Sequence, residues 1–446
     1  MDDLAYSQSE TAAIHSRRVI STWVDLYSRW DRHFWEIYTL SRRIESWCFN
    51  SNFILDKSEN SFEEKFISSL NKQAKHLFLW KNKNLSVVTR MQVALALILY
   101  GHIMRKQKFI QHSFTLMNNI YKGNFISNNI ISECNPSEIL ECLRILKIYT
   151  AYASKNFDIS NATVMKDTLR NVVISLKHGD DKLAVFNGGF EENTKKINKI
   201  LDTNSKKENK PVSVLSIPIC GYERLEAQRL LIIAKSSSFQ KNKSLNLGSL
   251  GFELSVGKQR LVVNCGTFSG DDINWRNATL NNAAYSTLTI NNLDPEILYK
   301  HAGWESSLRG EEDESTWLEL RQDGYINRFG FKHLRRFHMH HDGHELIGVD
   351  SLISSNKIIN NKLFVNLRFH LHPSVTPSQV GNKKEVLLRL NKKPGWIFET
   401  GLNNIKLEDS IYMGIKGEMK KTKQIVLNID LKKPKNEITW RFMRIT

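Results

Sequence analysis

The stretch SLNLGSLGFELSVGKQRLVVNCG spans residues 244–266 and decides the class of fold. Two apolar runs alternate with polar or small residues in it: Leu250, Phe252, Leu254 and Val256, then Leu261 and Val263. A period of two is typical of β-strands with one buried face. The pair Gly257-Lys258 between the runs is typical of a tight turn. The stretch therefore predicts an antiparallel hairpin.

The same period recurs on both sides of this hairpin, in short runs separated by Gly, Asn, Asp and Pro. These runs include VSVLSI (212–217), RLLIIAK (229–235), STLTI (286–290), KLFVNLRFHLH (362–372), EVLLRL (385–390) and KQIVLNI (423–429). Short strands in series favour an antiparallel sandwich over a parallel α/β sheet.

The first part of the chain has helical spacing instead. Its apolar-periodic segments are 10–28, 35–47, 62–80, 86–121, 136–154 and 162–176. Ser61 with Glu64, and Asn135-Pro136 with Glu138, have the spacing of capping boxes and predict helix starts.

The segment TNSKKENKP at 203–211 is polar, charged and proline-ended, which predicts a linker. We therefore expect an α+β chain with a helical domain at 1–202, the linker, and an antiparallel β-sandwich domain at 212–446.

Composition narrows the possible partners. The chain has 446 residues and a formal net charge of +17, which favours polyanions such as acidic polysaccharide, nucleic acid or anionic lipid. An AT-biased genome, rich in Lys, Asn and Ile codons, explains the same charge without selection for binding. Five cysteines without a CxxC pair favour neither a disulfide framework nor a zinc finger.

Motifs for other chemistries are absent. The sequence has no GxSxG, P-loop, GxGxxG after a strand, or HExxH. The consecutive carboxylates at 311–314 predict a solvated loop and not a glycosidase pair. The N-terminus lacks the layout of a secretory signal, and no apolar run reaches the ~20 residues of a membrane span.

Further segments stand in a recognisable order: SSLNKQAKHL (68–77), HGDDKLAVFNGG (178–189), GYERL (221–225), DGYINRFGFKHLRR (323–336), LIGVDSL (346–352) and RFHLHP (368–373). Together with the hairpin and AAYSTLTINN (283–292), they resemble the heparinase II/III family of polysaccharide lyases. The resemblance implies an α/α toroid followed by a β-sandwich. Compared with the family, we expect an incomplete toroid here, in a chain that starts partway into the family's helical domain. The implied location is the periplasm or cell envelope, with the cytoplasm as the alternative.

The chain departs from the family's motifs at chemically important positions. Asn246 stands near the family's first histidine, Asn264 near its acidic position, and Tyr285 in place of its last histidine. Ile131 stands where the resemblance places a histidine of the helical domain.

A lyase of this kind removes the C5 proton of a uronic acid. It needs groups that neutralise the neighbouring carboxylate, a base beside C5, and an acid for the leaving oxygen. The resemblance implies Tyr285, His333 and Arg335 as catalytic residues. The expected substrate-binding residues are Asn128, Asn129, Asn246 and Arg336.

Each of these residues also has a structural interpretation. His333 and Arg335 share one face of a strand, and Arg336 lies on the other face. In the structural interpretation, His333 is a sheet residue with satisfied hydrogen bonds and the two arginines face solvent. Tyr285 fits a half-buried strand aromatic. Asn135 fits a helix cap better than a catalytic group.

No cofactor is expected. His370 and His372 have usable metal-ligand spacing, and the group at 338–344 could add a third ligand, so zinc is the one metal considered. Three hypotheses follow: a lyase of uronic-acid glycans, a catalytically degraded protein that binds acidic glycans, and a truncated inactive product. Specific nucleic-acid binding is not expected, and the sequence leaves the oligomeric state open.

Overall fold

The computed structural model describes residues 9–80, 85–125, 134–153, 158–202, 216–217, 221–236, 248–296, 307–354, 363–381, 384–390, 393–402, 405–431 and 435–445. The chain divides into two compact units. The helical unit is Met1–Asn128 with Glu141–Leu169, and the sandwich unit is Asn129–Leu140 with Arg170–Thr446. The predicted linker at 203–211 lies outside the described residues.

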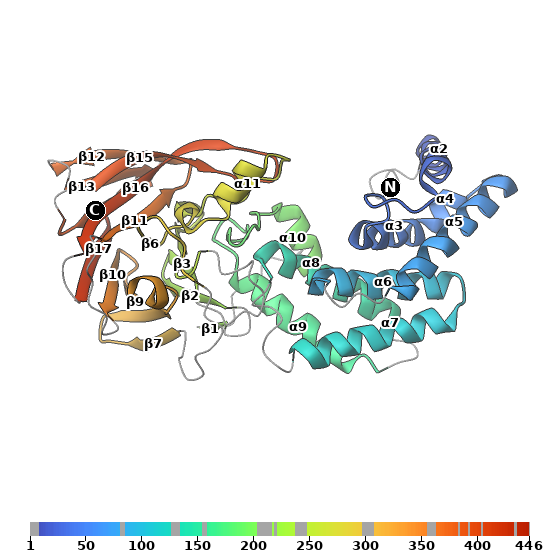
Figure 1. Ribbon diagram of the computed structural model, residues 1–446, viewed down its shortest axis with the longest axis horizontal. Coiled ribbons are helices and arrows are strands. Elements are labelled where there is room, and N and C mark those ends of the chain that lie inside the picture. Colours follow the sequence, from blue (N-terminus) through green and yellow to red (C-terminus); the bar gives the residue numbers. More distant parts are fainter. Residues whose placement is uncertain are drawn as a thin grey trace. The chain divides into compact units, whose positions relative to one another are not determined.

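Helices make up the first part of the chain, as predicted (Figure 1). They are α2 (Glu10–Tyr27), α3 (Ile37–Phe49), α4 (Ser51–Leu55), α5 (Asn60–Leu79), α6 (Val87–Ile103), α7 (Gln107–Ile120), the π-helical turn η1 (Tyr121–Phe125), α8 (Pro136–Ala153), α9 (Ser160–Ser175) and α10 (Thr194–Leu201). The prediction of one continuous helix over 86–121 is wrong. Arg105 adopts a left-handed conformation with φ of 52° and ends α6 before α7 begins.

The two predicted capping boxes had different outcomes. Asn135 caps α8 as expected: its Oδ1 accepts from the Glu138 N–H at 2.9 Å, and the Glu138 carboxylate accepts from the Asn135 N–H at 2.9 Å. The box at Ser61 is wrong, because α5 already begins at Asn60, after Glu59. Its Ser61 side chain contacts the Glu59 carboxylate instead.

The described strands of the sandwich unit form two antiparallel sheets (Figure 1). The first sheet has the order β1 (Ser216–Ile217), β2 (Tyr222–Ala227), β3 (Leu230–Lys235), β4 (Phe252–Val256), β5 (Gln259–Val263), β11 (Leu363–Leu371), β16 (Lys420–Leu431) and β15 (Ile405–Tyr412), with β6 (Leu288–Ile290) paired to β11. The second has the order β12 (Val375–Val380), β13 (Glu385–Leu390), β14 (Lys393–Thr400), β17 (Lys435–Arg444), β10 (Glu345–Ser354), β9 (Phe331–His340), β8 (Ser315–Gln322) and β7 (Ser307–Glu311). The pairing of β4 with β5 confirms the predicted hairpin.

Aromatic side chains from both sheets form the centre of the sandwich core. Phe252 of the first sheet stacks on Trp440 of the second, with ring centroids 5.5 Å apart. Phe369 meets the same indole edge-on at 4.9 Å. Offset and edge-to-face pairs of this kind stabilise a core beyond the area they bury. Gly348 lies beneath the indole, directly paired with Trp440 across β10 and β17.

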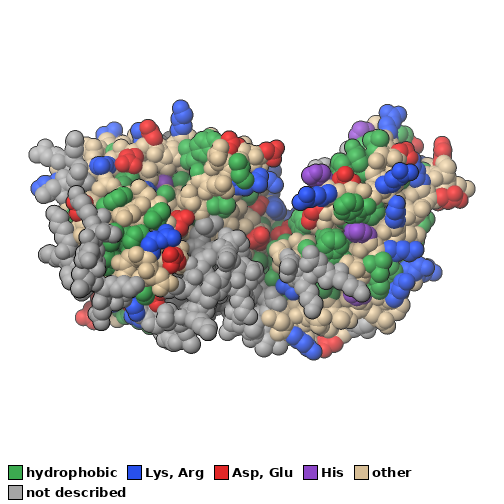
Figure 2. Space-filling model, in the orientation of Figure 1, with side chains coloured by type: hydrophobic (Ala, Val, Ile, Leu, Met, Phe, Trp, Pro, Cys, Tyr) green, Lys and Arg blue, Asp and Glu red, His purple; other side chains and the backbone are tan. Residues whose placement is uncertain are grey.

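The described helices include none that is long and apolar enough to cross a membrane. In Figure 2, basic and acidic side chains are mixed over the described surface of the face shown. The net positive charge of the chain is therefore not gathered into one patch on that face.

Gly348→Ala tests the packing of the core. A Cβ at this position would lie 2.0 Å from the Trp440 ring, so the indole has to move. Overpacking of this kind costs about 1–3 kcal/mol, and we expect the midpoint of chemical unfolding to fall accordingly. Gly401→Ala is the matched control, because a Cβ there meets nothing within 4 Å. Equal midpoints for the two variants would contradict this description of the core.

Candidate functional site

The segment that follows α9, residues 176–193, lies along the strands of the first sheet and is held there by buried polar contacts. Arg224 of β2 donates to the carbonyls of Ser175 and Lys177 at 3.0 and 2.9 Å. Asn264, at the end of β5, donates to the Val185 carbonyl at 3.0 Å. The segment thus covers this face of the sheet along its length.

Asn187 organises a compact polar cluster, the Asn187 cluster, which consists of Asn187, Tyr222, Lys235 and Tyr285. The Lys235 ammonium donates to Asn187 Oδ1 at 2.7 Å, and Asn187 Nδ2 donates to the Tyr222 hydroxyl at 3.3 Å. The Asn187 backbone hydrogen-bonds to Tyr285. The turn at FNGGF (186–190) produces this arrangement, since Asn187 and Gly188 both have positive φ, 50° and 86°.

Burial changes the acid–base properties of this cluster. It lowers the pKa of Lys235 to about 7, and it raises the pKa of Tyr285 above its ordinary value. Near neutral pH the cluster therefore combines an amine close to its titration point with a protonated phenol. A titratable group with such a shifted pKa is a candidate for general acid–base chemistry.

Tyr285 is buried, with 3% of its surface exposed. Its ring lies against the backbone of Gly248, where a Cβ would come within 2.2 Å of the ring. Gly248 also has a φ of 69°, so glycine is required there for two reasons. Tyr285 follows the 3-10 turn η3 (Asn282–Ala284) and precedes β6.

A second polar group holds the start of the covering segment. His178 contacts Glu253 at 2.9 Å and Ser255 at 2.8 Å, and Arg260 contacts Asp180 at 3.0 Å. Burial raises the pKa of Glu253 to about 7, against the opposing charge of Arg260, and it lowers the pKa of His178 well below the ordinary value. All of these residues except the partly exposed Asp180 are buried, and their contacts attach the segment to β4 and β5.

His372 belongs to a third polar group, beside β15. Its Nε2 lies 3.8 Å from Glu191, which accepts a hydrogen bond from the Tyr412 hydroxyl at 2.5 Å and also pairs with Lys182. Burial alone would raise the pKa of Glu191, but these partners outweigh it and lower that pKa below its ordinary range. His372 retains partial exposure and lies just beyond the end of β11.

His333 and Arg335 lie fully buried on one face of β9, and Arg336 lies on the other face, as their spacing predicts. Arg335 donates to both carboxylate oxygens of Asp350, at 2.8 and 3.1 Å, and His333 donates to one of them at 2.7 Å. Burial alone would raise the pKa of Asp350, but Arg335 and His333 lower it to about 2. Trp440 Nε1 donates to the same carboxylate at 2.8 Å.

Arg335 also reaches the first sheet. Its Nη1 donates to the carbonyls of Leu250 and Ser286 at 2.7 and 2.9 Å. The expectation that both arginines face solvent is therefore wrong for Arg335, because its strand position points into the core. Arg336 is exposed; it pairs with Glu319 at 2.6 Å and lies 5.0 Å above the Trp317 ring.

The described residues contain no group of three or more potential ligands able to hold a metal ion. His370 is buried: its Nε2 donates to the Ala283 carbonyl at 2.9 Å, and its Nδ1 lies 2.8 Å from the Ser410 hydroxyl and 3.4 Å from Cys265 Sγ. Burial lowers the pKa of His370 to about 4 and raises that of Cys265 to about 12. His370 and His372 are thus engaged in separate contacts.

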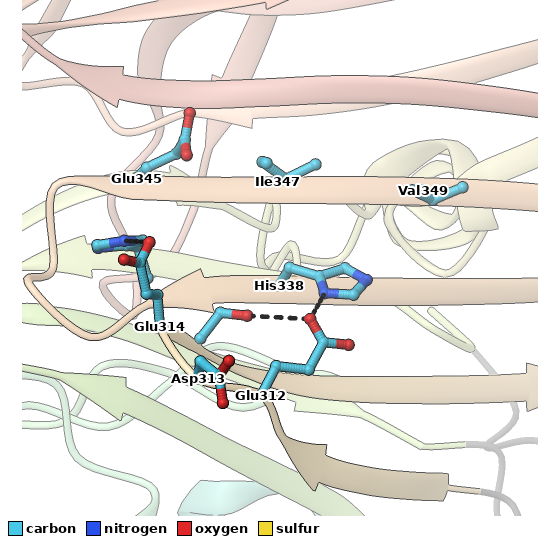
Figure 3. A pocket seen from close by; sticks show the side chains of 9 residues that line it. Glu312, Asp313, Glu314, His338, Glu345, Ile347 and Val349 are labelled. Carbon is cyan, nitrogen blue, oxygen red and sulfur yellow. Dashed lines mark hydrogen bonds and ion pairs between the residues drawn. The ribbon is translucent and has the colours of Figure 1, made fainter.

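The consecutive carboxylates are exposed, as predicted, at the turn between β7 and β8 (Figure 3). With histidines of β9 and an apolar floor on β10 they border a hollow of about 690 Å³. Figure 3 shows Glu312 pointing toward His338, 3.9 Å apart, with Ile347 and Val349 beyond them. This hollow is open and does not contain Tyr285 or His333.

Four positions of the proposed chemistry lie outside the described residues: Asn128, Asn129, Ile131 and Asn246. Arg335 hydrogen-bonds to the carbonyl of Ser286, which directly follows Tyr285 in the chain. Arg336 lies on the opposite face of the same strand as Arg335. The catalytic roles of Tyr285, His333 and Arg335 stay predictions.

Asn187 and Lys235 were missed as candidates. Both were visible in the sequence: Asn187 belongs to a quoted family segment, and Lys235 is a charged residue at the end of the apolar run RLLIIAK. A lysine at such a position is most often assumed to be exposed. In this fold it is buried.

Asp350→Asn tests the buried ion pair. The change leaves Arg335 without a full counter-charge in the core, which typically costs about 3–5 kcal/mol. We expect a lower free energy of unfolding near pH 7. The folded pKa of about 2 lies below the ordinary value of 3.8, so the wild-type advantage should be complete above about pH 4 and disappear as the pH falls through 2. Asp409→Asn, at an exposed pair with Lys423, should change little; equal losses would contradict the argument.

Lys235→Met tests the shifted lysine. An amine with a folded pKa of about 7 and an ordinary pKa of 10.5 destabilises the fold most at or below pH 7, and this penalty disappears as the pH rises toward 10.5. Wild-type protein should therefore gain stability relative to Lys235→Met between pH 7 and pH 10 in chemical unfolding experiments. Lys258→Met, at an exposed turn, should show no such trend. If the unfolding free energies of wild type and Lys235→Met changed in parallel with pH, the lowered pKa of Lys235 would be refuted.

Comparison with known proteins places this geometry in context. Among solved structures, a heparan sulfate lyase HepC mutant from Pedobacter heparinus matches 98% of this chain and 73% of its own, with 15% identity and a TM-score of 0.71. A heparinase III structure matches 99% of this chain and 76% of its own chain, with 13% identity and a TM-score of 0.72. A chondroitin AC lyase from Streptomyces coelicolor A3 matches 98% and 71%, with 8% identity and a TM-score of 0.58. These similarities confirm the fold class predicted from the sequence, a helical domain followed by a β-sandwich.

A curated relative, FtsZ-localized protein C from Caulobacter vibrioides, is 27% identical over 274 residues. The match covers 56% of this chain and 46% of the relative, so the chain spans less than half of that protein's length. The family model described as "Heparinase II/III-like, C-terminal" matches residues 209–441, which is more than half of the chain. The resemblance found in the sequence is thereby confirmed: the chain belongs to the heparinase II/III-like family.

Proposed function

We propose that this protein is a polysaccharide lyase that cleaves uronic-acid-containing acidic glycans by β-elimination. The observation that carries the proposal is the match of 98% of the chain to the fold of a heparan sulfate lyase. Family membership and the acid–base cluster at Asn187 support it. By the same analogy we propose the periplasm or cell envelope as the location, with the cytoplasm as the alternative.

Tyr285 is the proposed proton-transfer residue. A tyrosine can serve in turn as base toward C5 and as acid toward the leaving oxygen. Asn187 hydrogen-bonds to Tyr285, and the same residue contacts the Lys235 ammonium, whose charge would favour the tyrosinate form. Access to the substrate requires exposure of a ring that is now buried.

His333 and Arg335 support this chemistry as positioning residues in the proposal. Arg335 donates to the Ser286 carbonyl, directly after Tyr285, and Asp350 with His333 fixes the guanidinium. Arg336, Asn128, Asn129 and Asn246 are proposed to bind substrate. Zinc is not invoked, since the described His370 and His372 have separate partners.

A non-catalytic protein that binds acidic glycans is the second candidate. The specific observation in its favour is that Tyr285, His333 and Arg335 are 3%, 0% and 0% exposed. A substrate in this arrangement would reach none of the three side chains directly.

Ultraviolet absorbance of the unsaturated uronate product tests the proposal, with heparin, heparan sulfate and alginate as substrates. We expect turnover by wild-type protein and a loss on the order of a hundredfold or more in Tyr285→Phe, as is typical when a general acid–base group is removed. Tyr325→Phe is the matched control: Tyr325 is a buried tyrosine whose hydroxyl donates to the Leu288 carbonyl at 3.0 Å.

His333→Ala completes the set. Because His333 lies in the core, the thermal unfolding of the His333→Ala variant must be measured together with its activity. A loss of activity supports a role for His333 only if the variant remains folded. Flat absorbance traces for wild-type protein with retained glycan binding would reject the lyase and favour the binding protein. Equal losses in Tyr285→Phe and Tyr325→Phe would reject Tyr285 as the proton-transfer residue.

A further inference from the structure

The sandwich unit has a cavity of about 250 Å³ at the end of the β2–β3 hairpin that is away from Lys235. Its walls come from the C-terminal end of α9, the β2–β3 turn and the β4–β5 turn. The residues that carry charge in it are Lys177, Asp181, Arg224, Glu226 and Arg229.

Three cations and two carboxylates give this cavity a positive balance. Lys177 pairs with Asp181 at 2.8 Å, and Arg224 pairs with Glu226 at 2.7 Å. Each carboxylate is thus already matched by one cation. His178, which also lines the cavity, is engaged by Glu253 and Ser255.

Arg229 is the cation that remains. It is exposed in the β2–β3 turn, and its guanidinium lies against Gly257, where a Cβ would come within 2.7 Å of Nη2. Its backbone carbonyl accepts a hydrogen bond from the Gly257 N–H at 2.6 Å, but its guanidinium has no hydrogen-bond or ion-pair partner among the residues that the structure describes. A guanidinium beside a formed cavity presents paired donors that suit a carboxylate or a sulfate.

Hydrogen bonds and close backbone packing hold the walls of the cavity in place without a ligand. Arg224 is held by the carbonyls of Ser175 and Lys177. Gly179 packs so closely on Gly257 that a Cβ would lie 2.2 Å from the Gly257 carbonyl oxygen. A site with a preformed backbone loses less conformational entropy on binding.

The cavity and the Asn187 cluster lie on the same face of the hairpin. Directly paired residues share a face, and the pairs Tyr222↔Lys235 and Glu226↔Leu231 place the two sites at its opposite ends. Lys235 and Leu231 are four residues apart, about 13 Å at ~3.3 Å per residue. Of the two ends of this face, the cavity retains an exposed cation, Arg229, whereas the Asn187 cluster is buried.

We propose that this cavity binds an anionic group, carboxylate or sulfate, of the acidic glycan, with Arg229 as the principal contact and Lys177 and Arg224 as its walls. The proposal rests on the proposed function, because it takes the glycan as the ligand. It adds an anchoring site for the polymer that is separate from Tyr285, His333 and Arg335.

Isothermal titration with heparin and with alginate tests the site and separates the two sources of the anion. Arg229→Gln should weaken binding about tenfold, as expected for one charge-assisted contact. Lys258→Gln is the matched control, since it removes an exposed charge from the neighbouring β4–β5 turn outside the cavity. A loss with heparin alone would assign the contact to sulfate, and a loss with both polymers to the carboxylate that they share.

Glu226→Gln provides a change in the opposite direction. Glu226 is exposed, and its removal frees Arg224 for the ligand, so we expect several-fold tighter binding that partial unfolding could not produce. Equal affinities of Arg229→Gln and Lys258→Gln would overturn the site while leaving the proposed function intact. No binding by wild-type protein would overturn both. Equal Arg229-dependent binding of single-stranded DNA would overturn the assignment to a glycan.

Discussion

The buried carboxylate of Asp350 is the constraint on which the sandwich depends. It accepts hydrogen bonds from His333, Arg335 and Trp440, which belong to the two strands flanking β10. Arg335 extends the network to the first sheet through the carbonyls of Leu250 and Ser286. A charge in a core is tolerated only when it is paired and its hydrogen bonds are satisfied. The ion pair lies within the second sheet and holds Arg335 in place for the hydrogen bonds that join it to Leu250 and to Ser286, directly after Tyr285.

The covering segment at 176–193 adds polar and charged side chains to this scaffold. It contributes Asn187 to one end of the β2–β3 hairpin and Lys177 to the other. The buried contacts of His178 and Arg260 hold it between those ends. Of these two ends, the one at Lys177 retains an exposed cation, Arg229, that an acidic polymer can reach, whereas the Asn187 cluster is buried.

Local sequence signals predicted the fold well where the local environment decided the outcome. The β4–β5 hairpin and the Asn135 cap were confirmed, because turn geometry and capping depend on a few neighbouring residues. The single helix over 86–121 was wrong, since the left-handed residue that divides it is Arg105 and not a glycine. Ser61 was a plausible cap that the chain does not use, because α5 already begins at Asn60.

By itself the sequence determined the class of fold, the hairpin and the strand faces of His333, Arg335 and Arg336, because a period of two or 3.6 is a property of neighbouring residues. Only the tertiary structure decided what those residues contact. Arg335 had a catalytic and a solvent-facing interpretation and is instead bound to Asp350 in the core, and Lys235 ends an apolar run yet contacts Asn187, 48 positions away. Such pairings follow from strand register and burial. The resulting pKa values follow from the same packing, which no local pattern encodes.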